Sequence, residues 1–539
     1  MAHPPHPAEP PVRPSLADVA QGTGVIAQRR RHPVRRPPSR LRRRLIVLGV
    51  LALLTGIAGL VAIGWFLDDQ GRSPREWAPY IERRAQGNSS LFVQVGNLVA
   101  GTLLRMDRLP RPDEPVIPPS IGAAAARSGT PPTAARLVLN PAQLAAALAQ
   151  ATPGQVIQLV PGTWRIDGRG LALNRPGTAA APITLRAERL GDVTILSSAV
   201  EAFKISAPYW TIENLILRGV CGSHSDCEHA VHVVGAGSNA VIRNNRFEDL
   251  NAHIKINGED GLFPDNGRIE GNTFINAEPR HTRNPITPID LVAASNWRIA
   301  GNFIADIQRQ GVGSATYGAF IKGSGEGNVM ERNMVLCEWK LRRRSYSPNI
   351  GLSIGGGGSF PDAIKRDLGR SGNEQSAGVI RDNFIAFCND VGIYVNKGHR
   401  SVIAHNTVLD TAGIGIRFAD STAEVVGNLV DGPLQIRDNA VVRARDNETT
   451  NLLGLFVGLH PVHAMFRDAA RLDLRWRNRP NTITTGDVRP DLCGAERTGR
   501  VLPGAFEDFS RCREPAPTAT PATRAPAAPE PRPPTAPAR

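Results

Sequence analysis

Apolar and polar residues alternate in short runs along the middle of the chain, from about Arg136 onward. The runs are separated by Gly, Asn or Asp, and a period of two predicts β-strands rather than helices. Successive repeats share an Asn followed by apolar residues, at Asn214, Asn245, Asn272, Asn302, Asn333, Asn383, Asn406 and Asn428, with a weaker copy at Asn447. The one long gap in this series contains a glycine-rich insertion, Gly355 to Gly372.

A repeat of this length built from short strands predicts one coil of a parallel β-solenoid per unit. Stacked coils lie about 4.8 Å apart, so an Asn at the same turn of every coil can pass amide hydrogen bonds along the stack. Open solenoid ends expose strand edges and need covering. We expect the apolar helical stretch Pro141–Ala151 to cover the first coil and the segment Leu452–Trp476 to close the other end.

The first coils carry a resemblance to a known family. Gly154–Leu159 with Pro161–Trp164 resembles the opening of right-handed parallel β-helix proteins of the pectate-lyase-like superfamily, over residues 137–450. Gly177–Glu188 is similar to the chondroitinase B and alginate lyase group of polysaccharide lyases, over about residues 150–220. The resemblance implies an all-β fold, a right-handed parallel β-helix, but a scaffold signature alone does not fix the function.

An uncharged run, Leu45 to Leu67, precedes the repeats and is long enough to cross a bilayer as a helix. Arginines crowd its N-terminal side, so the positive-inside rule places residues 1–44 in the cytoplasm. A cleaved signal peptide is the alternative, although its apolar region would be shorter and followed by a small-residue cleavage site. We therefore expect a single-pass protein of the bacterial inner membrane with a periplasmic or otherwise extracytoplasmic main domain.

The net charge of +14 arises mainly from ten arginines ahead of this span and four in the C-terminal tail. It therefore indicates topology, and no nucleic-acid partner is expected. The predicted organisation is a basic disordered tail (1–44), a transmembrane helix (45–67), a stalk and linker (68–135), a β-helix domain (136–476), an irregular segment (477–512) and a Pro/Ala-rich disordered tail (513–539).

All six cysteines follow the span, where an oxidising compartment permits disulfides. Cys221 with Cys227 and Cys493 with Cys512 are the pairs closest in sequence. No Cys/His spacing indicates a zinc site.

On a solenoid with an apolar interior, a site must be built on outward-facing strand positions or on turns, and strand alternation identifies the outward-facing residues. These are His253, Lys255, Asn257, Asp290, Phe320 and Lys322. Aligning the coils on their asparagines places Lys255, Asp290 and Lys322 in one column on consecutive coils. Tyr394 falls in the same column two coils later, and Arg417 there or one place away.

The lyase resemblance implies roles for these residues. In that group a Lys abstracts a proton beside a uronate carboxylate, an Arg on a neighbouring coil assists, and Ca²⁺ binds acidic ligands. Carried over, Lys322 is the base. Beyond the resemblance, we expect Lys255 to pair with the carboxylate and Asp290 and His253 to orient groups or handle protons. Asn257, Phe320, Tyr394 and Arg417 are then substrate-binding residues. No metal is assigned, although Ca²⁺ could bind at Glu259, Asp260 and Asp265 in a long turn.

Two functions remain open at this point. One is binding or β-elimination of an anionic polysaccharide. The other is a non-enzymatic cell-envelope or adhesion module, in which the charged column only stabilises the stack. Polygalacturonase-type motifs, a phosphate-binding loop and a serine nucleophile elbow are absent from the sequence.

Overall fold

The computed structural model describes residues 40–110, 117–118, 120–125, 135–310, 315–341, 347–356, 366 and 373–513. Most of both predicted disordered tails lies outside these residues, namely residues 1–39 and 514–539. Most of the glycine-rich insertion lies outside them as well. The chain divides into two compact units, Met1–Ile63 and Gly64–Arg539.

Helix α1 (Arg40–Gln70) carries the predicted span. Its stretch Arg44–Phe66 is the one segment within the described residues that is long and apolar enough to cross a membrane. The apolar side chains along it are exposed, as a lipid-facing helix requires.

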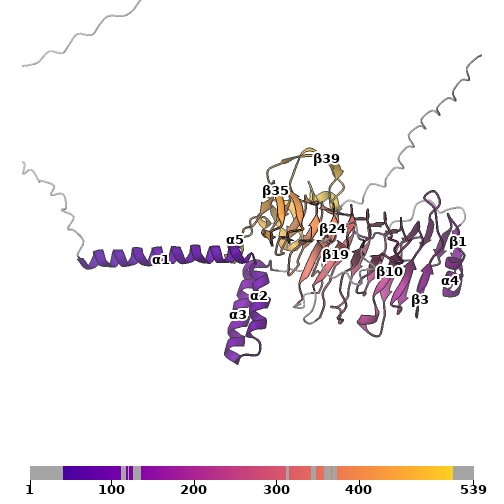
Figure 1. Cartoon of the computed structure of the whole chain (residues 1–539), viewed down its shortest axis with the longest axis horizontal. Helices are drawn as coiled ribbons and strands as arrows, with labels where there is room; N and C mark the ends of the chain where they lie inside the picture. The colour runs from indigo at the N-terminus through magenta and orange to yellow at the C-terminus, as the bar shows by residue number, and fades with distance from the viewer. Residues whose placement is uncertain are drawn as a thin grey trace, which may run out of the picture. The chain divides into compact units, whose positions relative to one another are not determined.

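The second unit is a parallel β-helix, in which each coil adds one strand to each of three long sheets (Figure 1). Sheet 1 consists of β1 (Ala135–Val138), β2 (Val156–Leu159), β5 (Ile183–Arg186), β8 (Trp210–Glu213), β11 (Val241–Arg243), β14 (Arg268–Glu270), β17 (Arg298–Ala300), β21 (Val329–Glu331), β25 (Val379–Arg381), β29 (Ser401–Ala404), β32 (Thr422–Val426) and β35 (Val441–Arg445).

Sheet 2 follows sheet 1 in every coil. It consists of β3 (Gly162–Ile166), β6 (Val193–Ser197), β9 (Ile216–Gly219), β12 (Arg246–Glu248), β15 (Thr273–Ile275), β18 (Phe303–Ala305), β22 (Met334–Leu336), β26 (Phe384–Ala386), β30 (Thr407–Leu409), β33 (Leu429–Val430) and β36 (Glu448–Thr449).

Sheet 3 completes each coil and carries most of the predicted site. It consists of β4 (Leu171–Leu173), β7 (Glu201–Ile205), β10 (His229–Val234), β13 (Ile254–Asn257), β16 (Ile289–Val292), β19 (Thr316–Lys322), β23 (Asn349–Gly355), β27 (Ile393–Asn396), β31 (Ile414–Arg417) and β34 (Leu434–Arg437). A short fourth sheet, β20 (Gly325–Glu326), β24 (Gln375–Ser376) and β28 (Gly398–His399), lies in the turns after it.

The interior is filled by apolar side chains that stack from coil to coil, as the alternation predicts. On sheet 1 the fully buried column is Ile212, Ile242, Ile269, Ile299, Met330, Ile380 and Ile403. Because these strands are buried on the inner face only, their outer residues are free to be polar.

Buried asparagines form a continuous ladder between sheets 1 and 2. Each one after Asn245 accepts from the backbone N–H and the side-chain amide of the preceding rung, as when Asn333 accepts from Asn302 at 3.0 and 2.9 Å. The ladder runs through Asn245, Asn272, Asn302, Asn333, Asn383, Asn406, Asn428 and Asn447. The prediction was wrong at its first member: Leu215 occupies that rung, and Asn214 bonds Asn244 instead.

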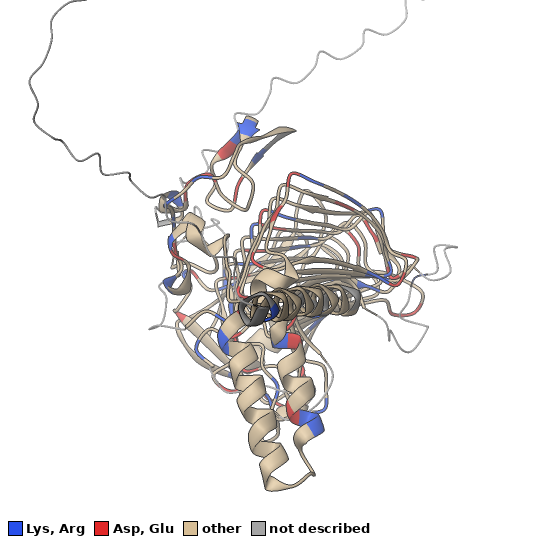
Figure 2. Cartoon of the chain, turned by 90° about the vertical axis from the view of Figure 1, so that its left-hand side faces the viewer, with Lys and Arg blue, Asp and Glu red and all other residues tan. Residues whose placement is uncertain are grey.

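The outer surface of sheet 1 carries a second, ionic ladder. Glu331 pairs with Arg298 at 2.6 Å on one neighbouring coil and with Arg381 at 2.7 Å on the other. Viewed end on, acidic and basic residues lie together along the edges of the stack (Figure 2). The other outward carboxylates of sheet 1 also have guanidinium partners: Glu213 pairs with Arg243, Glu270 with Arg298 and Glu424 with Arg445.

Helix α4 (Pro141–Ala149) covers the first coil and buries Leu144 and Leu148 in the main core. The prediction that Leu452–Trp476 closes the far end was wrong: β35 and β36 of the last coil are largely exposed, and the C-terminal segment packs along the side of the stack instead. It includes α5 (Leu452–Phe456), the hairpin of β37 (Phe466–Asp468) and β38 (Asp473–Trp476), and that of β39 (Ile483–Pro490) and β40 (Glu496–Val501). Leu474 and Phe506 pack against Phe303 and Phe384 in a second core on the outside of sheet 2.

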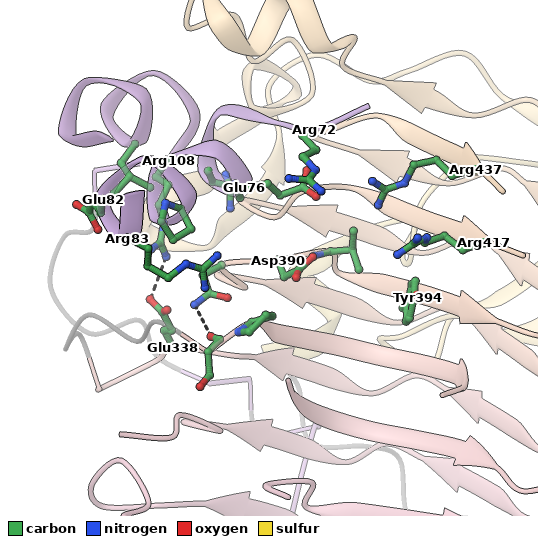
Figure 3. A pocket seen from close by; sticks show the side chains of 17 residues that line it. Arg72, Glu76, Glu82, Arg83, Arg108, Glu338, Asp390, Tyr394, Arg417 and Arg437 are labelled. Carbon is green, nitrogen blue, oxygen red and sulfur yellow. Dashed lines mark hydrogen bonds and ion pairs between the residues drawn. The ribbon is translucent and has the colours of Figure 1, made fainter. Parts of the chain in front are cut away.

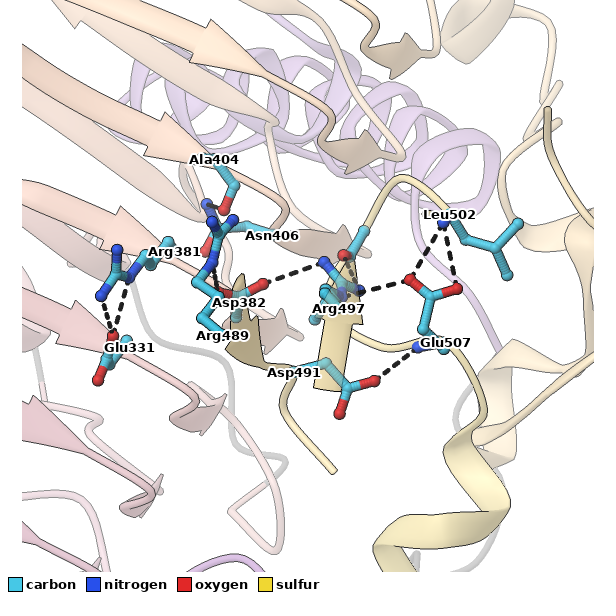
Figure 4. Close-up of polar contacts among 12 residues, drawn as sticks. Glu331, Arg381, Asp382, Ala404, Asn406, Arg489, Asp491, Arg497, Leu502 and Glu507 are labelled. Atoms are coloured by element: carbon cyan, nitrogen blue, oxygen red, sulfur yellow. Dashed lines mark hydrogen bonds and ion pairs between the residues drawn. The ribbon is translucent and has the colours of Figure 1, made fainter. Parts of the chain in front are cut away.

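A buried ion network fastens the β39–β40 hairpin to the β-helix (Figure 4). Asp382, which follows β25, accepts from Arg489 Nε at 2.8 Å and from Arg497 at 3.1 Å. Asp382 and Arg497 are both about 1% exposed, and Arg497 also donates to the Gly504 carbonyl.

Two helices, α2 (Pro74–Ala85) and α3 (Ser90–Asp107), form a hairpin that docks on the last coils. Arg75 is buried and binds Asp107 at 2.7 Å and Asp410 at 2.9 Å. Arg75 also donates to the Cys388 carbonyl, so one side chain joins the hairpin to two coils.

Disulfides join Cys221 to Cys227 and Cys493 to Cys512, the two pairs that are closest in sequence. A third disulfide, Cys337 to Cys388, links neighbouring coils on either side of the glycine-rich insertion. Sequence proximity could not reveal it, because these two cysteines are 51 residues apart.

Candidate functional site

The outer face of sheet 3 presents two adjacent rows of side chains. The first row, in strict register, is Lys204, His232, Lys255, Asp290, Phe320, Ser353 and Tyr394. The second row lies two residues further along each strand and includes Asn257, Lys322, Asn396, Arg417 and Arg437. A shift of two residues keeps a side chain on the same face, so both rows point outward.

The predicted pairing of Lys255 with Asp290 is present, since the two residues are in register and Lys255 Nζ lies 2.7 Å from Asp290 Oδ2. The placement of Lys322 in the same column was wrong. Phe320 lies opposite Asp290, and Lys322 lies opposite Val292. The turn after β19 contains β20, which makes it longer than the asparagine alignment assumed. Arg417 is likewise in the second row.

Lys322 occupies a distinctive environment. Its Nζ lies 4.3 Å from the ring centroid of Phe320, a cation–π geometry. Burial lowers the pKa of Lys322, and the charge of Lys255 lowers it further, while Asp290 and Glu374 act in the opposite direction. Two described parts of the insertion border it: Gly356 lies beside its side chain and Arg366 N–H donates to the Gly323 carbonyl at 3.0 Å.

The predicted outward position of His253 was wrong. His253 is fully buried and its ring packs edge-on against Phe247 and Phe274. It precedes β13, which begins at Ile254, so strand alternation does not extend to it. Burial lowers its pKa to about 3, which keeps the ring neutral and excludes it from proton handling on the outer face.

Sequence reasoning missed a histidine cluster beside Lys255. His232 contacts Glu201 at 2.8 Å through Nδ1 and Asn257 at 2.7 Å through Nε2. His229 contacts the Ala252 carbonyl through Nδ1, and burial with the nearby His232 lowers its pKa to about 4. Both histidines face outward, although residues three apart on a regular strand point to opposite faces.

A strand irregularity explains this cluster. The N–H groups of Ala230 and Val231 both donate to the His253 carbonyl, which is a bulge in β10. Ligand atoms of Glu201, His229 and His232 lie within 4.8 Å of one another, so this group could hold a divalent cation. The turn carboxylates predicted for Ca²⁺ do not form such a group among the described residues, since Glu259 pairs with Lys204 and Asp265 with Arg366.

A pocket of about 420 Å³ lies where the outer face of sheet 3 meets helix α2 (Figure 3). Two predicted substrate-binding residues line it, Tyr394 and Arg417. Its other charged lining residues are Arg72, Arg75, Glu76, Glu82, Arg83, Arg108, Glu338, Asp390 and Arg437. The predicted Asn257 and Phe320 lie elsewhere on the face and do not line this pocket.

The pocket combines several guanidinium groups with two strongly perturbed acids. Burial and the charge of Asp390 raise the pKa of Glu76 to about 7. Burial also raises the pKa of Asp390. Such a site can bind a carboxylate ligand through arginine and still present a protonated acid near neutral pH.

Comparisons with known proteins agree with the fold. The family model described as "Right handed beta helix region" matches residues 365–451. No curated protein sequence matches the chain. Similar solved structures include the pectate lyase Pel9A, which is 15% identical with a TM-score of 0.41, covering 67% of this chain and 90% of that chain.

Two further solved structures are similar at the same low level. An alginate lyase from Paenibacillus sp. strain FPU-7 is 14% identical with a TM-score of 0.35, covering 58% of this chain and 94% of that one. The polysaccharide lyase Pedsa3628 from Pseudopedobacter saltans is 14% identical with a TM-score of 0.32, covering 64% of this chain and 96% of that one. Such likeness concerns the fold alone.

Proposed function

We propose that this right-handed parallel β-helix protein binds an anionic polysaccharide on the outer face of sheet 3 and cleaves it by β-elimination, with Lys322 as the base. One observation carries the proposal. Lys322 faces outward with no acidic partner at hydrogen-bonding distance among the described residues, whereas the ionic ladder of sheet 1 pairs its charges. A lysine that only stabilised the stack would have such a partner.

The chemistry matches what β-elimination requires. A base removes the proton on the carbon next to the uronate carboxylate, the glycosidic C–O bond breaks, and a carbon–carbon double bond forms. The abstracted proton passes to the departing oxygen. A lysine with a lowered pKa is a competent base. Lys255, although paired with Asp290, adds positive charge that stabilises the carboxylate as it gains electron density.

The pocket at helix α2 supplies a second binding region in this proposal. Arg417 and Arg437 lie on its sheet 3 side, and guanidinium groups pair with carboxylates through two parallel hydrogen bonds. Tyr394 adds an aromatic surface against which a sugar ring can stack. A chain of uronates lying along sheet 3 would cross coils at about 4.8 Å per step.

The test is incubation of the full-length protein, in detergent, with alginate, pectate and chondroitin sulfate. Cleavage produces an unsaturated uronate that absorbs in the ultraviolet. We expect Lys322→Ala to lower the rate by about 10²-fold or more, the usual contribution of a general base. Lys340→Ala is the matched control, because Lys340 also lies over an aromatic ring, Trp339, at 4.4 Å. Full activity in Lys322→Ala would refute the assignment.

A non-enzymatic cell-envelope or adhesion module is the second candidate. The Lys255–Asp290 pair favours it, because this pair resembles the ionic ladder on sheet 1. Saturable polysaccharide binding without any unsaturated product, at every pH between 6 and 10, would select this candidate.

The proposed location is the bacterial inner membrane, with residues 1–44 in the cytoplasm and the β-helix in the periplasm. The arginines ahead of α1 and the three disulfides support it. Protease added to spheroplasts should digest the β-helix domain and spare an N-terminal epitope tag. Protection of the β-helix domain would contradict the proposed orientation.

A further inference from the structure

A second polar cluster lies around the turn between β33 and β34, where the last coils meet the C-terminal segment. Asp431 follows β33 and its carboxylate is fully buried. The hydroxyl of Thr450 donates to Asp431 Oδ1 at 3.0 Å. The other oxygen, Oδ2, faces two histidines from the segment after α5, His460 and His463.

Three ligand-type atoms converge at this point. His460 Nδ1 lies 2.9 Å and His463 Nε2 lies 2.7 Å from Asp431 Oδ2. The two imidazole rings are stacked nearly parallel, with centroids 4.8 Å apart. Both histidine side chains are largely buried, so water does not surround the cluster.

A hydrogen bond to the backbone orients the ring of His460. Its Nε2 lies 2.9 Å from the backbone carbonyl of Met106. A carbonyl only accepts, so Nε2 carries a proton, and Nδ1 is the ring nitrogen directed at the Asp431 carboxylate. Nδ1 is therefore the atom through which His460 would coordinate a cation held by Asp431.

His463, by contrast, lacks hydrogen-bond partners. Its Nε2 is close to Asp431 Oδ2 but makes no hydrogen bond of acceptable geometry, and its Nδ1 has no partner either, within the described residues. Buried polar atoms normally have a partner. The cluster therefore shows a short contact and an unsatisfied ring where a metal ligand set would show coordination.

We propose that Asp431, His460 and His463 bind a divalent transition metal, with zinc the best match. Two imidazoles and one carboxylate form a ligand set that zinc uses. Ligating histidines commonly donate their other ring N–H to a backbone carbonyl, as His460 does to Met106. Tetrahedral zinc ligands about 2.1 Å from the metal stand about 3.4 Å apart, so binding needs only a small outward movement of the rings.

The metal would act as a cross-link between three parts of the second unit. Met106 lies at the end of α3, Asp431 and Thr450 belong to the last coils, and the histidines belong to the C-terminal segment. This role is structural, and it is independent of the activity proposed for sheet 3.

The experiment uses the full-length chain in detergent without a polyhistidine tag, first stripped with a chelator. After exposure to Zn²⁺ and gel filtration, metal analysis should give a tightly held equivalent per chain that Asp431→Asn loses, whether or not the group of Glu201, His229 and His232 binds a second ion. Co²⁺ should give visible absorption bands, and Zn²⁺ should raise the melting temperature. Asp431→Asn and His463→Ala should abolish the bands, whereas the control His399→Ala, on β28, should retain them.

A milder variant keeps the test valid if those two fold poorly. Thr450→Val leaves all three ligands in place and removes only the hydroxyl that orients Asp431. Loss of such a partner weakens metal binding by about 10–100-fold. Absence of bound metal and of cobalt bands in the wild-type chain would overturn the proposal. So would metal binding that survives unchanged in both Asp431→Asn and Thr450→Val, because the metal would then lie elsewhere.

Discussion

Replacing one central rung of the asparagine ladder should cost far more stability than replacing its last rung. Asn333 is fully buried and makes four side-chain hydrogen bonds: it accepts from Asn302 N at 3.0 Å and Nδ2 at 2.9 Å, and donates to the Ile299 carbonyl and Asn383 Oδ1, both at 2.9 Å. Asn302 Nδ2 keeps a second acceptor, the Ile269 carbonyl. The backbone N–H of Asn302 has no second partner in the described part of the chain.

Hydrogen bonds contribute about 1 kcal/mol each, and a buried donor left without a partner costs about 1–3 kcal/mol. Asn333→Ala should therefore destabilise the β-helix by about 4 kcal/mol. This is a large share of the free energy of unfolding of a typical protein, about 5–15 kcal/mol. Asn447, the last rung, is partly exposed and bonds no further rung. Water replaces some of the hydrogen bonds that Asn447→Ala removes, so we expect the free energy of unfolding to fall by only about 1 kcal/mol in this variant.

The assay is urea unfolding of the full-length protein in detergent, followed by tryptophan fluorescence and by circular dichroism. The two probes must give the same midpoint for each variant, because repeat proteins can unfold in stages. If Asn333→Ala and Asn447→Ala shift the midpoint equally, the ladder does not stabilise the stack in the way its geometry indicates.

Three other predictions follow from single contacts. Asp382→Ala leaves the buried Arg497 with only its longer contact to Glu507, 3.3 Å away, so the domain should lose about 3–5 kcal/mol in thermal unfolding, and equal stability would refute the network of Figure 4. His253 has a pKa of about 3 when folded and an ordinary one when unfolded, so the unfolded chain binds the extra proton and stability falls as pH drops below about 6.5. His253→Phe should remove about 2 kcal/mol of that loss at pH 5, measured as a flatter pH profile of the urea midpoint. Arg417→Gln should raise KM for an acidic polysaccharide several-fold and leave kcat nearly unchanged, and the opposite pattern would remove Arg417 from substrate binding.

The sequence predicted the solenoid well because its signals are local and repeated. Alternation identifies the inner face of every strand, and the pairing of Lys255 with Asp290 follows from it. Register across a turn is less predictable, since the extra strand β20 displaced Lys322 by two positions. Alternation also fails outside regular strands, which is why His253 was placed on the wrong face.

Other parts of the site depend on contacts between distant segments. The pocket beside Tyr394 needs helix α2, which lies about 300 residues earlier, and no periodicity relates the two. The cluster of His229 and His232 needs a bulge, and the cluster around Asp431 needs the fold of the C-terminal segment. Both are tertiary arrangements that have no fixed spacing in the sequence.

The Cys337–Cys388 disulfide has a practical consequence for protein engineering. It joins the coils on both sides of the glycine-rich insertion, so the covalent path between those coils does not depend on the insertion itself. A protease site built into the insertion would give two fragments that separate only under reducing and denaturing conditions. The same bond makes this loop a suitable position for a replaceable module, because exchanging it leaves the neighbouring coils covalently joined.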